Sequence, residues 1–357
     1  MNAILLDASA LIIAAVVAAL ATPLVIRLAT HLGVIDKMGD ARRVHDVPTP
    51  RIGGVSVFFG FAFALFAVLG VALENPHLFA IHLGRVFSHG NFDWMHDQLD
   101  ASRNLVGLLF GSMLILGVGL WDDIMQMRPR NKFLAQVVVA LVSMLYGFVI
   151  RGINDPFDHA AGIHWIAFPW WIGVPLTLLW YVGMMNAINF IDGLDGLLAG
   201  VAAISSLFLF VVASLHGNPV VALVVIALAG ASLGFLPYNF NPARIFLGDS
   251  GSLFIGYVFA TVSIIGASKT AIAVGLLVPL IVLALPIADT AATIVRRATS
   301  GRRITEADRG HFHHQLIFRF GLNVRQAVLL IYVVCIVLGS VALALSGSIV
   351  PGWEIVR

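Results

Sequence analysis

Long apolar stretches recur along the whole chain, and they limit what it can fold into. Ten of them approach the roughly 20 residues that a helix needs to cross a bilayer: 5–26, 54–72, 105–120, 133–150, 169–186, 196–214, 219–237, 251–267, 271–294 and 326–347. Soluble domains contain roughly 25% charged residues, whereas this chain contains 11%. The sequence therefore predicts an all-α, polytopic integral membrane protein of about ten transmembrane helices, with residues 1–357 as a single domain.

Lysines and arginines fall mostly on one side of the predicted bundle. If successive helices alternate in direction, the loops at 27–53, 121–132, 187–195, 238–250 and 295–325 share a side, and they hold 16 of the 21 Lys and Arg residues. The positive-inside rule predicts that this side faces the cytoplasm. The net charge of +2 gives no basis for nucleic-acid binding, so membrane lipids are the expected surroundings.

Two adjacent carboxylates, Asp122 and Asp123, end one apolar stretch, and Lys132 follows in the next loop. Adjacent carboxylates repel each other, and a nearby cation offsets that repulsion. Lysine is also a compact cation that suits phosphate. The alternative is a helix cap beside ordinary positive-inside residues, but the combination favours a site that handles phosphate.

A second polar cluster repeats every three residues, at Asn186, Asn189, Asp192 and Asp195. If this segment is helical, the spacing aligns all four side chains on one face. Gly193 permits a tight turn and a close approach of the backbone to a ligand. No basic residue lies in this loop, so a metal ion is the expected counter-charge.

Asp249 begins another apolar stretch, among the small residues of Phe-Leu-Gly-Asp-Ser-Gly-Ser. Mg²⁺ prefers oxygen ligands and often takes one or two from the protein and others from substrate phosphates. Asp249 and Asn189 are therefore a candidate Mg²⁺ pair, and Phe246 is a candidate for stacking on a base. Capping of the following helix is the alternative role of Asp249.

Three histidines, His311, His313 and His314, follow five arginines between residues 296 and 309. Helical zinc sites favour histidines four residues apart, so zinc is not expected. The arginines favour a site that grips phosphates, and the alternative is a positive-inside loop with incidental histidines. The first loop adds weaker candidates for substrate contacts: His45, Thr49 and Arg51.

Taken together, these motifs resemble those of the polyprenyl-phosphate N-acetylhexosamine-1-phosphate transferases, the glycosyltransferase family 4 that includes WecA, TagO and MraY. The resemblance rests on Pro-Thr-Pro-Arg-Ile-Gly-Gly at 48–54, Asn-Ala-Ile-Asn-Phe-Ile-Asp-Gly-Leu-Asp-Gly at 186–196, Phe-Leu-Gly-Asp-Ser-Gly-Ser at 246–252 and Asp-Arg-Gly-His-Phe-His-His at 308–314. These segments span most of the chain.

The resemblance implies a reaction at the cytoplasmic face of a bacterial inner membrane. A UDP-N-acetylhexosamine and undecaprenyl phosphate would give the lipid-linked diphosphate sugar and UMP, with Mg²⁺ required and Mn²⁺ as the alternative ion. The product would start a lipid-linked envelope glycan, such as the O-antigen of lipopolysaccharide or a cell-wall polymer. The resemblance is also compatible with a homodimer. It favours direct attack by the lipid phosphate, with a two-step path through a phosphorylated aspartate as the alternative.

The resemblance also implies roles for the candidate residues. Asp249 would be the principal Mg²⁺ ligand, with help from Asn189. Asp122 and Asp123 would orient the lipid phosphate and accept its proton, and Lys132 would hold the diphosphate. The other expected substrate contacts are Asp192, Gly193 and Asp195 at the uridine, Phe246 on the uracil, and Asn239 near the diphosphate. Asn186, which begins the polar repeat that includes Asp192 and Asp195, is a further expected substrate contact. The sugar phosphate would meet Arg302, Arg303, Arg309, His311, His313 and His314.

The histidine motif indicates which UDP-sugar is the expected donor. His311-Phe312-His313-His314 after Asp308-Arg309 resembles the WecA and TagO type, whose expected donor is UDP-GlcNAc. A related acetamido sugar, such as N-acetyl-fucosamine or N-acetyl-quinovosamine, and transfer of MurNAc-pentapeptide phosphate are the alternatives within the family. A secondary transporter with broken helices is the alternative from another class, and a membrane scaffold would have no use for the Asn189 to Asp195 stripe.

Overall fold

The computed structural model describes residues 3–36, 48–74, 94–154, 165–269 and 312–349, with a few residues between 281 and 292. Its helices are α1 (Ala3–Leu32), α2 (Gly54–Glu74), α4 (Trp94–Met125), α5 (Pro129–Leu145), α6 (Trp170–Ile191), α7 (Leu197–Leu215), α8 (Pro219–Asn239), α9 (Gly248–Lys269), α12 (Phe312–Phe318) and α13 (Val324–Ile349). Two short antiparallel ribbons pair β1 (Ile35–Asp36) with β2 (Thr49–Pro50), and β3 (Gly152–Asn154) with β4 (Trp165–Ala167).

Eight of the described helices are long and apolar enough to cross a membrane, which confirms the predicted all-α, polytopic class. The predicted span 133–150 corresponds to the 17-residue α5, which begins earlier because a proline fits the first turn of a helix. It ends earlier because Gly147 adopts a positive φ of 95°. The predicted span 271–294 lies mostly outside the described residues, so the number ten stays a prediction.

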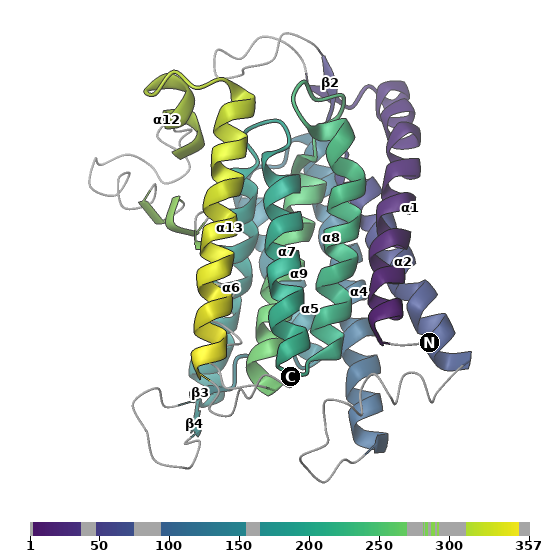
Figure 1. The fold of residues 1–357 in the computed structure, drawn as a ribbon, viewed down its shortest axis with the longest axis vertical. Helices are drawn as coiled ribbons and strands as arrows, with labels where there is room; N and C mark the ends of the chain where they lie inside the picture. The colour runs from purple at the N-terminus through teal and green to yellow at the C-terminus, as the bar shows by residue number, and fades with distance from the viewer. Residues whose placement is uncertain are drawn as a thin grey trace, which may run out of the picture.

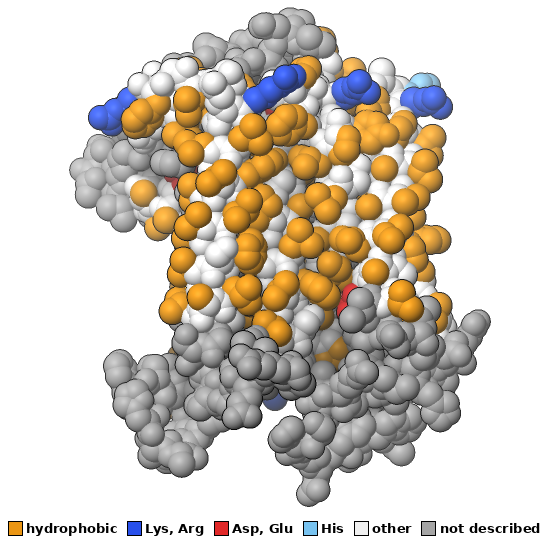
Figure 2. All heavy atoms as spheres, viewed as in Figure 1, with side chains coloured by type: hydrophobic (Ala, Val, Ile, Leu, Met, Phe, Trp, Pro, Cys, Tyr) orange, Lys and Arg blue, Asp and Glu red, His pale blue; other side chains and the backbone are white. Residues whose placement is uncertain are grey.

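The long helices lie side by side, and the segments that carry the candidate residues meet at one end of the bundle (Figure 1). β2, α12 and the start of α13 lie at this end. α8 is largely buried and packs against α1, α7 and α2, while α9 packs against α4 and α6. Hydrophobic side chains cover the sides of the visible face, and basic side chains gather at the end that carries the candidate residues (Figure 2). We call this end the basic end.

Hydrogen bonds between backbones join two loops at the basic end. Phe246 N donates to Pro50 O at 2.7 Å, and Gly53 N and Gly54 N donate to Phe246 O and Leu247 O at 2.9 and 2.8 Å. The start of α2 can approach the start of α9 this closely only because Gly54 lacks a side chain, since a Cβ there would overlap Gly251. The loop before α2 and the loop before α9 therefore form one unit.

Gly119 gives the first test of this packing. A methyl group at Gly119 on α4 would overlap the backbone of Asp249 and Ser250, whereas one at Gly117 would meet nothing within 4 Å. We expect Gly119→Ala to destabilise the protein by about 1–3 kcal/mol, as overpacked interiors do, and Gly117→Ala to leave stability unchanged or slightly higher. Thermal unfolding in detergent compares the two variants, and equal unfolding temperatures would contradict this packing.

Candidate active site

Lys132 lies between two carboxylates at the basic end. Its Nζ is 2.9 Å from Asp122 Oδ2 and 2.9 Å from Asp249 Oδ2. The three residues come from the end of α4, the first turn of α5 and the first turn of α9. All three side chains are at most 20% exposed, so water screens their charges less than it would at an open surface. The ammonium thus joins the ends of three helices.

Asp123 binds the start of α9. Its carboxylate accepts hydrogen bonds from Asp249 N at 2.9 Å and Ser250 N at 3.0 Å. A carboxylate at this place satisfies the free N–H groups of the helix and interacts favourably with the helix dipole. Arg51 Nε lies 3.6 Å from the same carboxylate. Each hydrogen bond to a charged group contributes about 1.5–3 kcal/mol, so Asp123 fixes where Asp249 lies.

Asn189 lies beside Asp249, and their predicted role as a Mg²⁺ pair stays a prediction. Its Nδ2 donates to Asp249 Oδ1 and, at 2.7 Å, to Ser252 Oγ. The contact uses the amide nitrogen, so shared coordination of an ion would require the amide oxygen to turn toward it. One turn earlier on α6, Asn186 Nδ2 donates to Gln136 Oε1 at 2.7 Å.

The residues after α6 depart from the predicted stripe. α6 ends at Ile191, and Gly196 adopts a positive φ of 78° before α7 begins. The condition for one shared face, a helix through all four polar residues, therefore holds only for Asn186 and Asn189, because α6 ends at Ile191 before Asp192 and Asp195. Asp195 turns toward a different loop and accepts hydrogen bonds from Asn241 Nδ2 and Ala243 N, both at 3.0 Å.

Asn239 reinforces the same junction between loops. Its Oδ1 accepts from Gly196 N at 3.1 Å, and its Nδ2 donates to Ile245 O at 2.9 Å. Tyr332 on α13 donates from its hydroxyl to Gly196 O. In this structure Asn239 and Asp195 therefore hold the turn before α7 against the loop that follows α8. Contact with a substrate stays a prediction for both.

The pKa of Asp192 reflects its burial and the negative charges around it. Burial, followed by the negative charges of Asp249 and Asp123, raises the pKa of Asp192 to about 8. A raised pKa favours the protonated carboxyl at neutral pH, because burial disfavours the charged form and the neighbouring carboxylates repel a further negative charge. A cation that binds near these acids would lower this pKa.

The oxygen ligands that Mg²⁺ requires are present in part at this site. Within the described part of the chain, no three His, Cys, Asp or Glu side chains converge into a group that could hold a metal ion. Mg²⁺ is nevertheless commonly bound by one or two carboxylates together with substrate phosphates. The carboxylates of Asp122 and Asp249 face each other across Lys132, and this oxygen-rich pair fits such an ion.

The remaining predicted residues divide into two groups. Gly193 is exposed in the turn before α7, and Phe246 is partly buried in the loop before α9. The predicted phosphate grip cannot be placed, because Arg302, Arg303, Arg309 and His311 lie outside the described residues. His313 and His314 fall in α12, whose position is described for the backbone but not for these two side chains. His45 is also outside the described residues.

The structure adds residues that sequence reasoning missed or ranked low. Gln136 lies one turn after Lys132 on α5, so the helical period could have predicted that both lie on one face of α5. Arg51 was a weaker candidate, yet it lies beside Asp123. Ser252, which accepts from Asn189, had no separate signal within its motif. These three residues contact Asn186, Asp123 and Asn189, respectively.

The chain is similar to a described family and to several known proteins. Residues 105–267 match the family described as glycosyl transferase family 4. The chain is 33% identical over 328 residues to a Bacillus subtilis protein named probable undecaprenyl-phosphate N-acetylglucosaminyl 1-phosphate transferase, covering 92% of this chain and 81% of that protein. It is 34% identical over 355 residues to the decaprenyl-phosphate N-acetylglucosaminephosphotransferase of Mycobacterium tuberculosis, covering 94% and 81%.

A second type of relative is also similar. The phospho-N-acetylmuramoyl-pentapeptide-transferase of Staphylococcus saprophyticus is 30% identical over 266 residues, covering 69% of this chain and 77% of that protein. The likeness to the N-acetylglucosamine enzymes thus extends over more of the chain. The matched family and the extent of these alignments confirm the resemblance seen in the sequence motifs, and the chain belongs to glycosyl transferase family 4.

Proposed function

We propose that the protein transfers N-acetylglucosamine 1-phosphate from UDP-GlcNAc to undecaprenyl phosphate, giving undecaprenyl-diphospho-GlcNAc and UMP. Family membership and the names of the similar proteins support the class of reaction. The observation that carries the proposal is the position of Lys132 between Asp122 and Asp249 at the basic end of a membrane bundle. We further propose that this end faces the cytoplasm.

The chemistry needs such a site because both substrates are anions. Phosphoryl transfer depends mainly on positioning the two reactants and on neutralising their charge. Lys132 can exchange a carboxylate for a diphosphate oxygen, because an ammonium has three donors and no fixed fork. Arg51 adds a second cation beside Asp123. One substrate is a lipid and the other is soluble, so a site at the end of the helices lets both reach it.

Mg²⁺ is part of the proposal. Asp249, together with a neighbouring carboxylate such as Asp122, would hold the ion. When bound, Mg²⁺ would supply a Lewis acid and a template for the diphosphate oxygens. Asn189 keeps the Asp249 carboxylate in place through its amide nitrogen, which is a positioning role and does not require Asn189 to be a ligand.

The two adjacent aspartates have different surroundings. Both oxygens of Asp123 accept hydrogen bonds from the start of α9. Asp122 accepts from Met127 N at 2.7 Å through Oδ1 and meets Lys132 through Oδ2. Displacement of Lys132 by substrate would free Asp122 Oδ2. We therefore propose that Asp122 meets the lipid phosphate and that Asp123 positions α9.

The reaction we propose is a single displacement. A phosphate oxygen of the lipid attacks the β-phosphorus of UDP-GlcNAc, the bond from that phosphorus to the bridging oxygen breaks, and UMP leaves with the electron pair. Asp122 is near enough to Lys132 to share its hydrogen-bonding network, so it can take a proton that the lipid phosphate still carries. No covalent intermediate on the protein is required.

Release of UMP tests the proposed function. Purified protein in detergent is incubated with UDP-GlcNAc, undecaprenyl phosphate and Mg²⁺, and we expect UMP and lipid-linked GlcNAc in equal amounts. Omission of the lipid and chelation of the metal are the controls, and each should abolish both products. Absence of UMP in the complete mixture would favour a transporter. Turnover of UDP-MurNAc-pentapeptide but not of UDP-GlcNAc would overturn the assigned donor.

The single displacement has its own test. The protein is incubated with Mg²⁺ and UDP-GlcNAc labelled in the sugar, without lipid, and is then denatured and separated. We expect no label on the protein and no stoichiometric release of UMP, because the attacking phosphate is missing. A burst of UMP equal to the amount of protein, with sugar phosphate bound to an aspartate, would establish the two-step path instead.

A further inference from the structure

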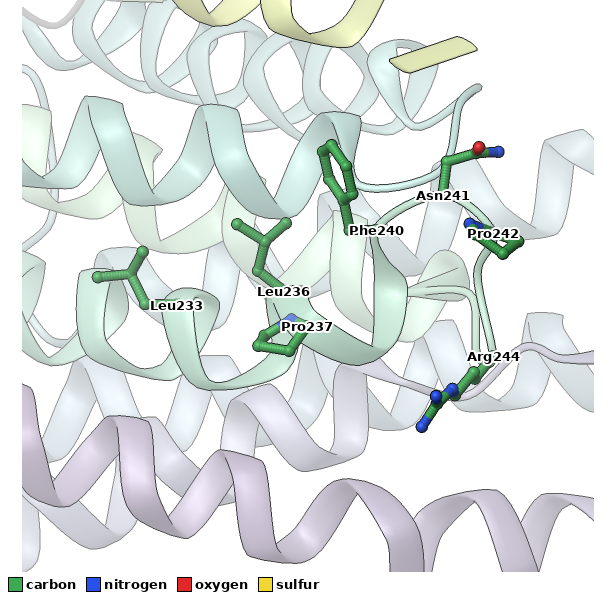
Figure 3. Close-up of a pocket in the computed structure, with 7 residues that line it drawn as sticks. All are labelled: Leu233, Leu236, Pro237, Phe240, Asn241, Pro242 and Arg244. Carbon is green, nitrogen blue, oxygen red and sulfur yellow. The ribbon is translucent and has the colours of Figure 1, made fainter.

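A groove lies at the end of α8 and along the loop that follows it. Residues 220–232 of α8 are buried without interruption, and exposure begins at Leu233, which is 39% exposed. From there the last turns of the helix and the following loop line a cavity of about 530 Å³ (Figure 3). The groove therefore exists only near the basic end, where a bilayer changes from hydrocarbon to headgroups.

The lining of the groove changes from apolar to polar along its length. Leu233, Leu236, Pro237 and Phe240 line the part beside the helix. Asn241 and Arg244 line the part beyond it, on the loop (Figure 3). A phospholipid has the same order of chemistry, with an acyl chain in the hydrocarbon and a phosphate at its edge. A soluble anion would have no use for the apolar part.

Two guanidinium groups lie at the polar end of the groove. Arg244 lines the groove and is exposed. Arg325, at the start of α13, donates from Nε to Asn241 O at 3.0 Å, which brings a second guanidinium to the same loop. Asp195 is the acid bonded to this loop, but it is 2% exposed and its carboxylate accepts from Asn241 Nδ2 and Ala243 N.

We propose that this groove binds an anionic phospholipid from the leaflet at the basic end. An acyl chain lies against Leu233, Leu236 and Pro237, and the lipid phosphate binds Arg244 with Arg325 beside it. Basic pockets between transmembrane helices bind anionic headgroups in this way, and each cation near the surface contributes about 1 kcal/mol. The inference does not depend on the proposed transferase activity, because Asp122, Lys132 and Asp249 do not line the groove and the inference is tested by binding alone.

A lipid bound in the groove would stabilise the loop that Asp195 contacts. Asn241 links the groove to Asp195, since its side chain binds Asp195 and its carbonyl oxygen accepts a hydrogen bond from Arg325. A phosphate that draws Arg244 and Arg325 together would therefore stabilise the loop between Phe240 and Arg244. This loop is continuous with the segment that leads to Asp249.

Native mass spectrometry of the full chain in detergent tests the site. The protein is titrated with phosphatidylglycerol and phosphatidylcholine of identical acyl chains. We expect the wild type to retain phosphatidylglycerol preferentially, and Arg244→Gln to lower its apparent affinity for that lipid about fivefold without changing the binding of phosphatidylcholine. Arg27→Gln is the matched control, because Arg27 lies near the same end on α1 and does not line the groove.

Several outcomes would overturn the proposal. Equal retention of the two lipids by the wild type would show that the groove does not select charge. An equal loss in Arg244→Gln and Arg27→Gln would show a diffuse surface effect. Displacement of one phosphatidylglycerol by one undecaprenyl phosphate, with the same dependence on Arg244, would assign the groove to the acceptor lipid. Displacement by millimolar glycerol phosphate would assign it to a soluble anion.

Discussion

The Lys132 ammonium between Asp122 and Asp249 is the contact on which the site depends. Removing these charges from water costs free energy that their attraction only partly returns, so the cluster is poorly explained as a device for stability. The cluster instead positions the candidate site residues, because it joins the end of α4 to the first turns of α5 and α9. Asp123 adds to this by binding the first turn of α9.

The same cluster explains how two anionic substrates could meet at a membrane surface. The ammonium is already paired with carboxylates, so a diphosphate that reaches it replaces one strong interaction with another. The acids that remain would then repel the substrates unless a cation binds among them. The pKa of Asp192 is raised first by its burial and then by the charges of Asp249 and Asp123, which is consistent with such repulsion. A divalent ion and Lys132 would thus act together.

The sequence predicted the helical membrane fold, and its short motifs singled out Asn189 and Asp249, which lie side by side in the structure. Hydropathy and short motifs carry that information because they are local. The role of Asp123 at the start of α9 was not predictable in this way, since the two lie 126 residues apart. The hydrogen-bond partners of Asp195 were not predictable from its motif, because the direction of its side chain depends on the left-handed turn at Gly196 and on the loop at Asn241.

Coupling between Lys132 and Asp249 is the central claim, and a double-mutant cycle measures it most directly. The rate of UMP release is determined for the wild type, Lys132→Met, Asp249→Asn and the double variant, with Asp7→Asn as a control acid on α1. We expect each single change to lower kcat at least about 100-fold, and the double variant to lose little more than either, because the residues act as one unit. Losses that multiply, or full activity in Asp249→Asn, would contradict the account.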